Sequence, residues 1–404
     1  MEREVVAKVA QDEIETAELT IDRWVPGGLG LAYHDGKTWL VRGALPGEKI
    51  RARATSVRRD LRHAVVDEVL EASPDRLALP WEGDDVRNGW DFQHIAYPAQ
   101  LAAKRAMVMD AFRRTGGITL GDGFQILPSP KEFGYRTRAT WHLDPNTGNV
   151  GYMAAESHRV VDVEFCPIVE PSLNEALTKT RESIRAGLSA SLVYRAAAGE
   201  NGAISFNGVG DPPYLWRNVG GYRYRFDPTS FFQANGSLLE AQVDEALWLA
   251  NSLEGDGVGI ALDFYCGVGL FTLPLGKKFE KVVGIESDVN SVKHARRNAH
   301  SNDADTVSFM SMSTDRVFRE QKKLARSARF ALMDPPRSGL DEKTRTGIIE
   351  AAIPALTYVS CDPTTLARDL KIFLANGYEL ERVQGLDCFP QTHHVEVVAH
   401  LRVP

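Results

Sequence analysis

The chain of 404 residues has only four cysteines, all far apart. So few thiols exclude a disulfide scaffold and predict a reduced, cytoplasmic protein. No run approaches the roughly 18 apolar residues of a transmembrane helix, so we expect no membrane partner. The acidic N-terminus lacks the apolar segment of a secretory signal. Positive charge is not in excess either, because the net charge is −7; this excludes a chain that is basic throughout, but not a local basic surface.

Three sections of the chain differ in pattern. Residues 1–72 alternate short apolar runs with Gly and Asp-Gly turns, which predicts a small β-barrel. Residues 73–225 mix helical and alternating stretches and predict an α+β domain. Residues 226–404 alternate strands with helices, which is typical of a doubly wound parallel α/β sheet. Two last strands, at 378–383 and 396–402, predict an antiparallel addition to that sheet.

Residues 49–63 form a basic segment, which contains six Lys or Arg and only one acidic residue, Asp60. In a strand, Lys49, Arg51 and Arg53 share one face. The segment either contacts nucleic-acid phosphates or is a solvated edge strand protected by charge. The sequence leaves both interpretations open.

The first turn of the α/β section carries a glycine pattern typical of a ligand site. Gly267 and Gly269 follow Asp263, but Thr272 stands at the third position of the dinucleotide fingerprint. An acidic strand end followed by G-x-G resembles instead the S-adenosylmethionine turn of class I methyltransferases. Glu286 ends the second strand, where a carboxylate can accept hydrogen bonds from both ribose hydroxyls.

The ends of two further strands contain candidate functional residues. Asp334-Pro335-Pro336-Arg337 leaves the fourth strand rigidly, and Arg337 stands where methyltransferases of amino groups carry an aromatic residue, which disfavours that reaction. Cys361 ends the fifth strand just before a helix, whose N-terminus favours the thiolate. Cys361 is therefore our candidate nucleophile.

The end of the chain supplies a candidate base and no metal site. Glu396 begins the last strand and could serve as a general base. His393 and His394 are adjacent, and no further ligand is spaced to join them, so we predict no metal there.

Five motifs occur in the order of a known family: Ser230-Phe231-Phe232-Gln233-Ala234-Asn235, Asp263-Phe264-Tyr265-Cys266-Gly267-Val268-Gly269, Asp334-Pro335-Pro336-Arg337, Tyr358-Val359-Ser360-Cys361-Asp362-Pro363 and Phe389-Pro390 with His394-Val395-Glu396. Together they closely resemble the RNA uracil-C5 methyltransferases, over nearly the whole chain. The resemblance implies that residues 1–72 are a TRAM-like RNA-binding barrel, 73–225 a central RNA-binding domain and 226–404 a class I methyltransferase domain.

The resemblance also implies roles for single residues. Cys361 would be the nucleophile and Glu396 the base, while the S-adenosylmethionine site would be lined by Gln233, Tyr265, Glu286 and Asp334. The thiolate would attack C6 of a uridine that is single-stranded or flipped out of its helix. Leu270 stands where relatives often carry a polar cofactor contact, and we assign it no role.

One departure from the family concerns iron. Many relatives hold an iron–sulfur cluster with cysteines at the positions that here read Trp81, Arg87 and Trp90, and only the later Cys166 remains. A cluster needs about four thiolates. We therefore predict no cluster in this chain.

Three alternatives remain open. An RNA cytosine-C5 methyltransferase would use the same thiolate chemistry, but with its nucleophile in a different motif. An RNA-binding protein that has lost catalysis would have a degraded turn or no nucleophile, and a NAD-dependent enzyme is disfavoured by the missing third glycine. We expect a monomer that acts on ribosomal rather than transfer RNA.

Overall fold

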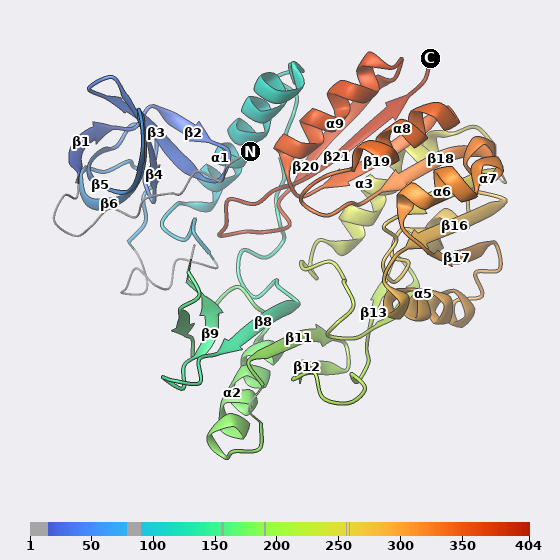
Figure 1. Cartoon of the computed structure of the whole chain (residues 1–404), viewed down its shortest axis with the longest axis horizontal. Helices are drawn as coiled ribbons and strands as arrows, with labels where there is room; N and C mark the ends of the chain where they lie inside the picture. Colours follow the sequence, from blue (N-terminus) through green and yellow to red (C-terminus); the bar gives the residue numbers. More distant parts are fainter. Residues whose placement is uncertain (1–14, 79–89, 155–156, 190, 256, 258) are drawn as a thin grey trace.

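The computed structural model describes the chain except residues 1–14, 79–89, 155–156, 190, 256 and 258. In this described part, three larger sheets surround a common centre (Figure 1), and a fourth sheet is a two-stranded hairpin. Among the described residues, no helix is both long and apolar enough to cross a bilayer.

The N-terminal sheet has six strands in the order β1-β5-β6-β4-β3-β2. Their bounds are β1 (Thr16–Thr20), β2 (Arg23–Val25), β3 (Leu29–His34), β4 (Lys37–Arg42), β5 (Lys49–Arg58) and β6 (Leu61–Glu71). The curved sheet encloses a core around Trp39, Val41 and Ile50, which are fully buried. Asp35 and Gly36 both have positive φ, as the tight turn predicted between β3 and β4 requires.

The basic strand β5 is not at an edge, because β1 pairs with one of its sides and β6 with the other. The interpretation as a solvated edge strand is therefore wrong. Arg51 forms ion pairs with Glu18 and Glu68, and Arg53 with Asp67. Acids of the neighbouring strands thus offset part of the positive charge that the sequence places in this segment, which weakens the case for phosphate contacts there.

The central sheet is antiparallel, in the order β10-β9-β8-β11-β12. It consists of β8 (Arg138–Leu143), β9 (Val150–Met153), β10 (Val160–Asp162), β11 (Val193–Gly199) and β12 (Gly202–Phe206). Helix α2 (Pro171–Arg185) packs on one face through Leu173 and Leu177, against Trp141 and Tyr194. The side chains that alternate with Trp141 and Tyr194 therefore point to the other face.

The C-terminal sheet has eight strands in the order β17-β16-β15-β18-β19-β21-β20-β7. The parallel strands are β15 (Ile260–Phe264), β16 (Lys281–Glu286), β17 (Val307–Ser311), β18 (Ala328–Met333) and β19 (Ala355–Ser360). Strand β21 (Glu396–Arg402) runs antiparallel between β19 and β20 (Glu379–Leu386). This confirms the predicted doubly wound fold with its antiparallel addition.

Helices cover both faces of this sheet. Buried side chains of α3 (Leu239–Ser252), α4 (Thr272–Leu275) and α5 (Val289–Ser301) share one core with the hairpin of β13 (Leu215–Val219) and β14 (Tyr222–Phe226). The other core contains α6 (Thr314–Glu320), α7 (Lys322–Ser327), α8 (Glu342–Ala351) and α9 (Pro363–Ala375). The short helices α6 and α7 were not predicted.

Helix α1 (Tyr97–Ala111) continues into a π-helical turn, Phe112–Gly116, and ends at the left-handed Gly117. It packs away from the central sheet: Val108 and Phe112 are buried in the core shared with α9. Strand β7 (Ile126–Leu127) then pairs with β20. Residues 97–127 thus extend the C-terminal sheet and its core.

Candidate active site

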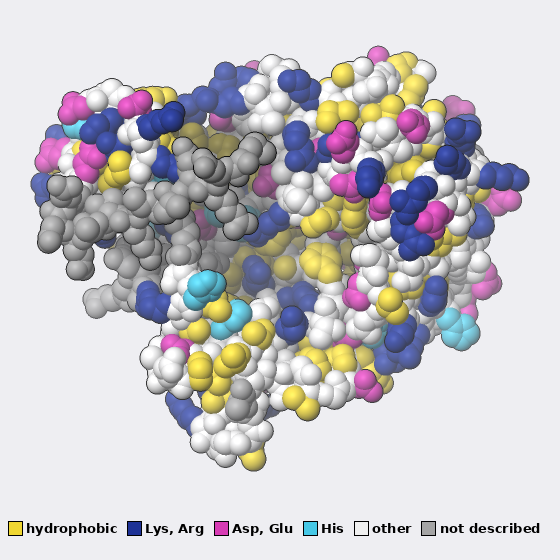
Figure 2. Space-filling view, viewed as in Figure 1, with side chains coloured by type: hydrophobic (Ala, Val, Ile, Leu, Met, Phe, Trp, Pro, Cys, Tyr) yellow, Lys and Arg dark blue, Asp and Glu magenta, His cyan; other side chains and the backbone are white. Residues whose placement is uncertain are grey.

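The carboxyl ends of β15, β16, β18 and β19 open into a cavity of about 780 Å³ that also reaches the central sheet. Figure 2 shows the molecule hollowed between its parts, with Lys and Arg side chains around the hollow. All six residues predicted as a site line this cavity: Gln233, Tyr265, Glu286, Asp334, Cys361 and Glu396. The cavity is within the usual size range of a ligand site.

Cys361 directly follows β19 and is half-buried, whereas the other three cysteines are buried. Desolvation and then the charge of Glu396 raise the pKa of the Cys361 thiol to about 12, while Arg337 opposes the increase. The expectation that the helix N-terminus lowers this pKa is wrong for the ligand-free protein. Asp362 caps the helix by accepting hydrogen bonds from the N–H groups of Thr364 and Thr365, so its own negative charge offsets the helix dipole.

Two carboxyl groups share the wall of the cavity beside the thiol. Gln233 Nε2 donates to Asp334 Oδ2 at 2.8 Å. Desolvation nevertheless raises the pKa of Asp334 to about 7. Burial and the neighbouring Asp334 raise the pKa of Glu396 well above its usual value. Within the described part of the chain, neither carboxyl group forms an ion pair with Lys or Arg.

The glycine turn places further acids at the same sheet edge. Asp263 is fully buried; its Oδ2 accepts from the Thr272 hydroxyl at 2.5 Å, and its Oδ1 has no partner among the described residues. Burial raises the pKa of Asp263 to about 8. Glu286 Oε2 accepts from the Gly267 N–H at 3.2 Å, which holds this carboxylate against the turn. Tyr265 has φ +63°, a left-handed conformation that non-glycine residues rarely adopt.

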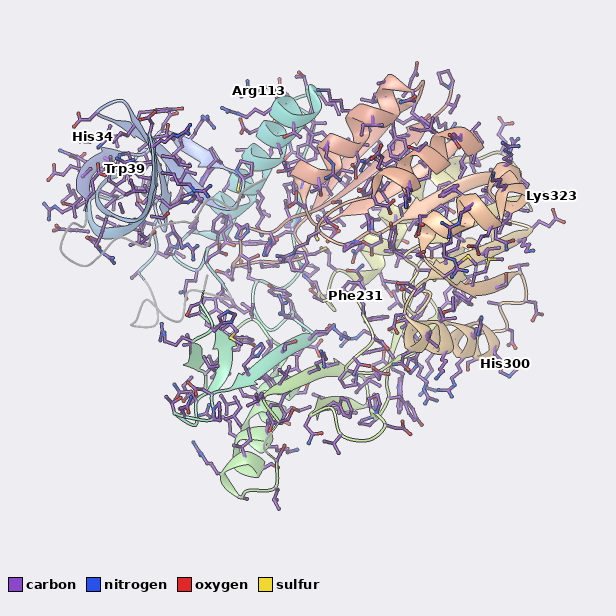
Figure 3. The ribbon with its side chains drawn as sticks, viewed as in Figure 1. His34, Trp39, Arg113, Phe231, His300 and Lys323 are labelled. Atoms are coloured by element: carbon purple, nitrogen blue, oxygen red, sulfur yellow. The ribbon has the colours of Figure 1, made fainter. Side chains whose placement is uncertain are left out.

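Four arginines also line the cavity within the described part of the chain, and the sequence did not single out three of them. Arg136, Arg138 and Arg195 come from the central section and Arg337 from the loop after β18. In the β8–β11 register, Arg138 and Arg195 share the face that α2 leaves free. The alternation at residues 135–141 was the available signal, but only the strand pairing shows which way that face points. Phe231, which is 61% exposed, lies between the two sheets (Figure 3).

Arg337 is held in place from the last loop of the chain. Its guanidinium donates to His394 Nε2 at 3.2 Å. Desolvation, with His393 and Arg337 nearby, lowers the pKa of His394 to about 3, so His394 is neutral and accepts this bond. His393 Nδ1 pairs with Asp91 Oδ2 at 2.6 Å, and the two histidine rings are 4.0 Å apart.

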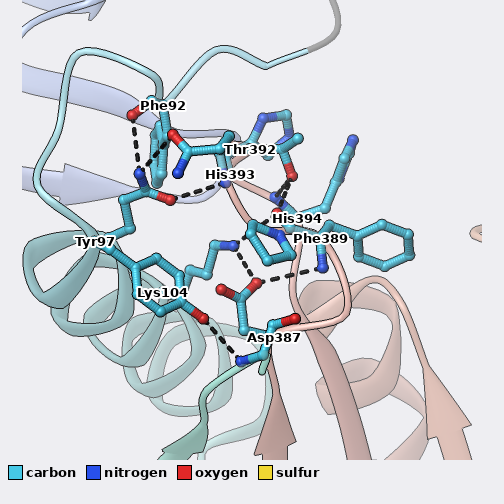
Figure 4. Close-up of polar contacts among 12 residues, drawn as sticks. Phe92, Tyr97, Lys104, Asp387, Phe389, Thr392, His393 and His394 are labelled. Atoms are coloured by element: carbon cyan, nitrogen blue, oxygen red, sulfur yellow. Dashed lines mark hydrogen bonds and ion pairs between the residues drawn. The ribbon is translucent and has the colours of Figure 1, made fainter. Parts of the chain in front are cut away.

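Helix α1 anchors the segment that leads to Glu396 (Figure 4). Lys104 Nζ donates to Asp387 Oδ1 at 2.5 Å and to the Phe389 carbonyl at 2.9 Å, and both charged side chains are fully buried. Gln100 exchanges two hydrogen bonds with Gln391, of 2.9 and 3.0 Å. The position of the candidate base thus depends on a helix almost 300 residues earlier in the chain.

Of the four positions where relatives carry cluster cysteines, the structure describes two. Trp90 and Cys166 both line a neighbouring cavity of about 340 Å³. Trp81 and Arg87 lie outside the described residues. The described residues include no group of three or more His, Cys, Asp or Glu side chains that could hold a metal ion.

Residues 215–403 match the model of the family described as tRNA (Uracil-5-)-methyltransferase. The chain is 32% identical to "23S rRNA (uracil(1939)-C(5))-methyltransferase RlmD" of Pseudomonas savastanoi, over 94% of this chain and 92% of the relative. It is also 32% identical to an "Uncharacterized RNA methyltransferase" of Thermosynechococcus vestitus, over 96% of this chain and 98% of the relative.

The solved structure of Pyrococcus abyssi tRNA (uracil-54, C5)-methyltransferase, in complex with S-adenosyl-L-homocysteine, has a similar fold. The TM-score is 0.71 and the identity 24%, and the match covers 95% of this chain and all of that one. Together, the sequence matches and the ordered motifs show that the chain belongs to the RNA uracil-C5 methyltransferase family, which confirms the resemblance.

Proposed function

We propose that the protein transfers a methyl group from S-adenosylmethionine to C5 of a uridine in RNA, through a covalent bond between Cys361 and C6. The observation that supports this best is the convergence on one cavity of five residues, one from each of the five motifs, together with Glu286 at the end of β16. We assign catalysis to residues 226–404 together with residues 97–127, which extend their sheet and core. We assign RNA binding to residues 1–72 and to the remainder of residues 73–225, and we expect a monomer because one chain supplies the whole site.

The cavity fits a cofactor that carries a positive charge. Asp334 and Glu396 lie together without a cationic partner among the described residues, and burial, with the charge of Asp334 added to it, raises the pKa of Glu396. A sulfonium would relieve this repulsion. Glu286, at the end of β16, is placed to accept hydrogen bonds from ribose hydroxyls, and Gln233 and Tyr265 complete the wall. When bound, the cofactor supplies an electrophilic methyl group.

The residues of the chain divide the reaction into steps. The Cys361 thiolate bonds to C6, and the electrons of the C5–C6 double bond move to the C4 carbonyl to give an enolate. C5 of the enolate then takes up the methyl group, whose bond to the sulfonium sulfur breaks, so that the cofactor would leave as a neutral thioether. Glu396 removes the proton from C5, the C5–C6 double bond re-forms, and the thiolate leaves. Burial suits Glu396 to this role, because a carboxylate with a raised pKa is a stronger base once it is ionised.

The arginines on the central sheet are suited to RNA. Arg136, Arg138 and Arg195 put positive charge on the side of the cavity away from the acids, where phosphates flanking a flipped uridine would lie. The relative in Pseudomonas savastanoi is named as a 23S rRNA methyltransferase and covers nearly the whole chain. We therefore favour ribosomal over transfer RNA.

Nucleoside mass spectrometry tests the function directly. RNA from a strain that lacks the gene would be separated into ribosomal and transfer fractions and treated with the protein and S-adenosylmethionine. We expect new 5-methyluridine in the ribosomal fraction, and none with the Cys361→Ala variant. New 5-methylcytidine would overturn the choice of base, and unchanged turnover by Cys361→Ala would overturn the covalent mechanism.

A further inference from the structure

A basic surface lies outside the cavity, where the β13–β14 hairpin meets α5. The two elements are joined by side-chain amides: the N–H of Arg225 donates to Asn298 Oδ1 at 2.7 Å, and the N–H of Arg223 donates to Asn302 Oδ1 at 2.8 Å. Residues 214–226 and 289–301 contain six Lys or Arg and no Asp or Glu. In a chain of net charge −7, this is an uneven distribution.

Most of these cations are not neutralised within the protein. Arg217 pairs with Glu170. The other five pair with no carboxylate in the described part of the chain: Arg223, Arg225, Lys293, Arg296 and Arg297. All but Arg225 are exposed. Lys and Arg side chains are visible around α5 in Figure 2, and His300, near the end of this helix, is labelled in Figure 3.

Aromatic rings alternate with the arginines on the hairpin. The guanidinium of Arg225 lies 3.6 Å from the ring centre of Tyr214, and that of Arg223 lies 4.4 Å from that of Trp216. Tyr214 is 47% exposed. Their neighbours Tyr222, Tyr224 and Phe226 point into the core instead. Trp216 is half-buried. Accessible rings beside cations are the combination that binds bases and phosphates together.

The surface is continuous with the mouth of the cavity. Asp227 directly follows β14 and is bonded by two side chains of α5, Asn290 at 2.7 Å and His294 at 2.9 Å. The next residues, Pro228 and Thr229, line the cavity, as does Ser287 just before α5. An RNA with one nucleotide in the cavity would therefore pass directly onto the hairpin and the helix.

We propose that the outer face of β13–β14 and the exposed face of α5, which we call the hairpin–helix surface, bind the backbone and exposed bases of the RNA beyond the target nucleotide. The inference rests on the proposed function for the identity of the polyanion. It assigns affinity to this surface and reaction chemistry to the cavity.

Salt dependence of RNA binding tests the inference. The triple variant Arg223→Gln, Lys293→Gln, Arg297→Gln removes three exposed cations. The matched control Lys322→Gln, Lys323→Gln, Arg326→Gln removes three exposed cations from α7, which packs on the opposite face of the sheet. The probe is deproteinised ribosomal RNA, bound at about 50 to 300 mM salt. The plot of log K against log salt has a negative slope, and each lost phosphate contact reduces the magnitude of this slope by roughly 0.7–0.9.

We expect the magnitude of the slope to decrease by about 2 to 3 in the hairpin–helix variant and to remain unchanged in the control. A wild-type slope in the first variant, or an equal fall in both, would overturn the inference. Trp216→Leu should weaken binding at every salt concentration without changing the slope, because it removes stacking and no charge. Binding needs no turnover, so a failure to form 5-methyluridine would count against the proposed function and leave this result standing.

Discussion

Replacing Arg337 by Gln should make the Cys361 thiol harder to ionise. Arg337 is the cation that opposes burial and Glu396 at this thiol, whose pKa is raised to about 12. An opposite charge nearby lowers the pKa of an acid by roughly 1–3 units, and since Arg337 is exposed to solvent we take the lower end. The pKa of Cys361 should therefore rise by about one unit in the variant, which corresponds to about 1.4 kcal/mol and to roughly tenfold less thiolate.

The assay is alkylation of Cys361 by iodoacetamide between about pH 7 and 9, followed by mass spectrometry of the peptide. With a pKa near 12, the thiolate fraction at pH 8 is on the order of 10⁻⁴, so the rate should rise about tenfold per pH unit. In Arg337→Gln it should be roughly tenfold lower at each pH. Arg195→Gln, which removes a cation from the opposite wall, should match the wild type. Equal rates in Arg337→Gln and the wild type would refute the reasoning.

Three more predictions concern the candidate base, a buried ion pair and iron. Glu396→Gln should accumulate a covalent protein–RNA adduct, because the C5 proton has no acceptor; normal turnover without an adduct on a denaturing gel would argue against its role as the base. Lys104→Met should lower the free energy of unfolding by about 3–5 kcal/mol in urea titrations, because it leaves the buried Asp387 unpaired, and adding Asp387→Leu should restore part of the loss. Protein purified without oxygen should be colourless and contain less than stoichiometric iron by elemental analysis.

The sequence predicted the catalytic edge of the sheet because the rule involved is general. Residues at the carboxyl ends of parallel strands meet in space, so Asp334 and Cys361 had to be neighbours once the strands were identified. The glycine turn and Glu286 follow from the same rule. The short helices α6 and α7 were not predicted from the sequence, because each has fewer than eight residues and shows too little hydrophobic periodicity.

Long-range packing could not be predicted. The sequence places Cys361 at a helix N-terminus, but only the structure shows that burial, and then Glu396 from β21, raise the pKa of its thiol. Similarly, the charges of β5 look unpaired until β1 and β6 supply Glu18 and Asp67. In both cases the partner lies on another strand, at a distance that no local pattern specifies.

The division of charge inside the cavity explains how an acidic chain can act on RNA. The acids Glu286, Asp334 and Glu396 stand at the sheet edge, while Arg136 and Arg195 face them from the central section. A cationic ligand and an anionic one would therefore each find opposite charge on its own side of one space. Since the repulsion between RNA and the acids falls off within about 8 Å in physiological salt, the arginines and the hairpin–helix surface can determine how RNA approaches, despite the net charge of −7.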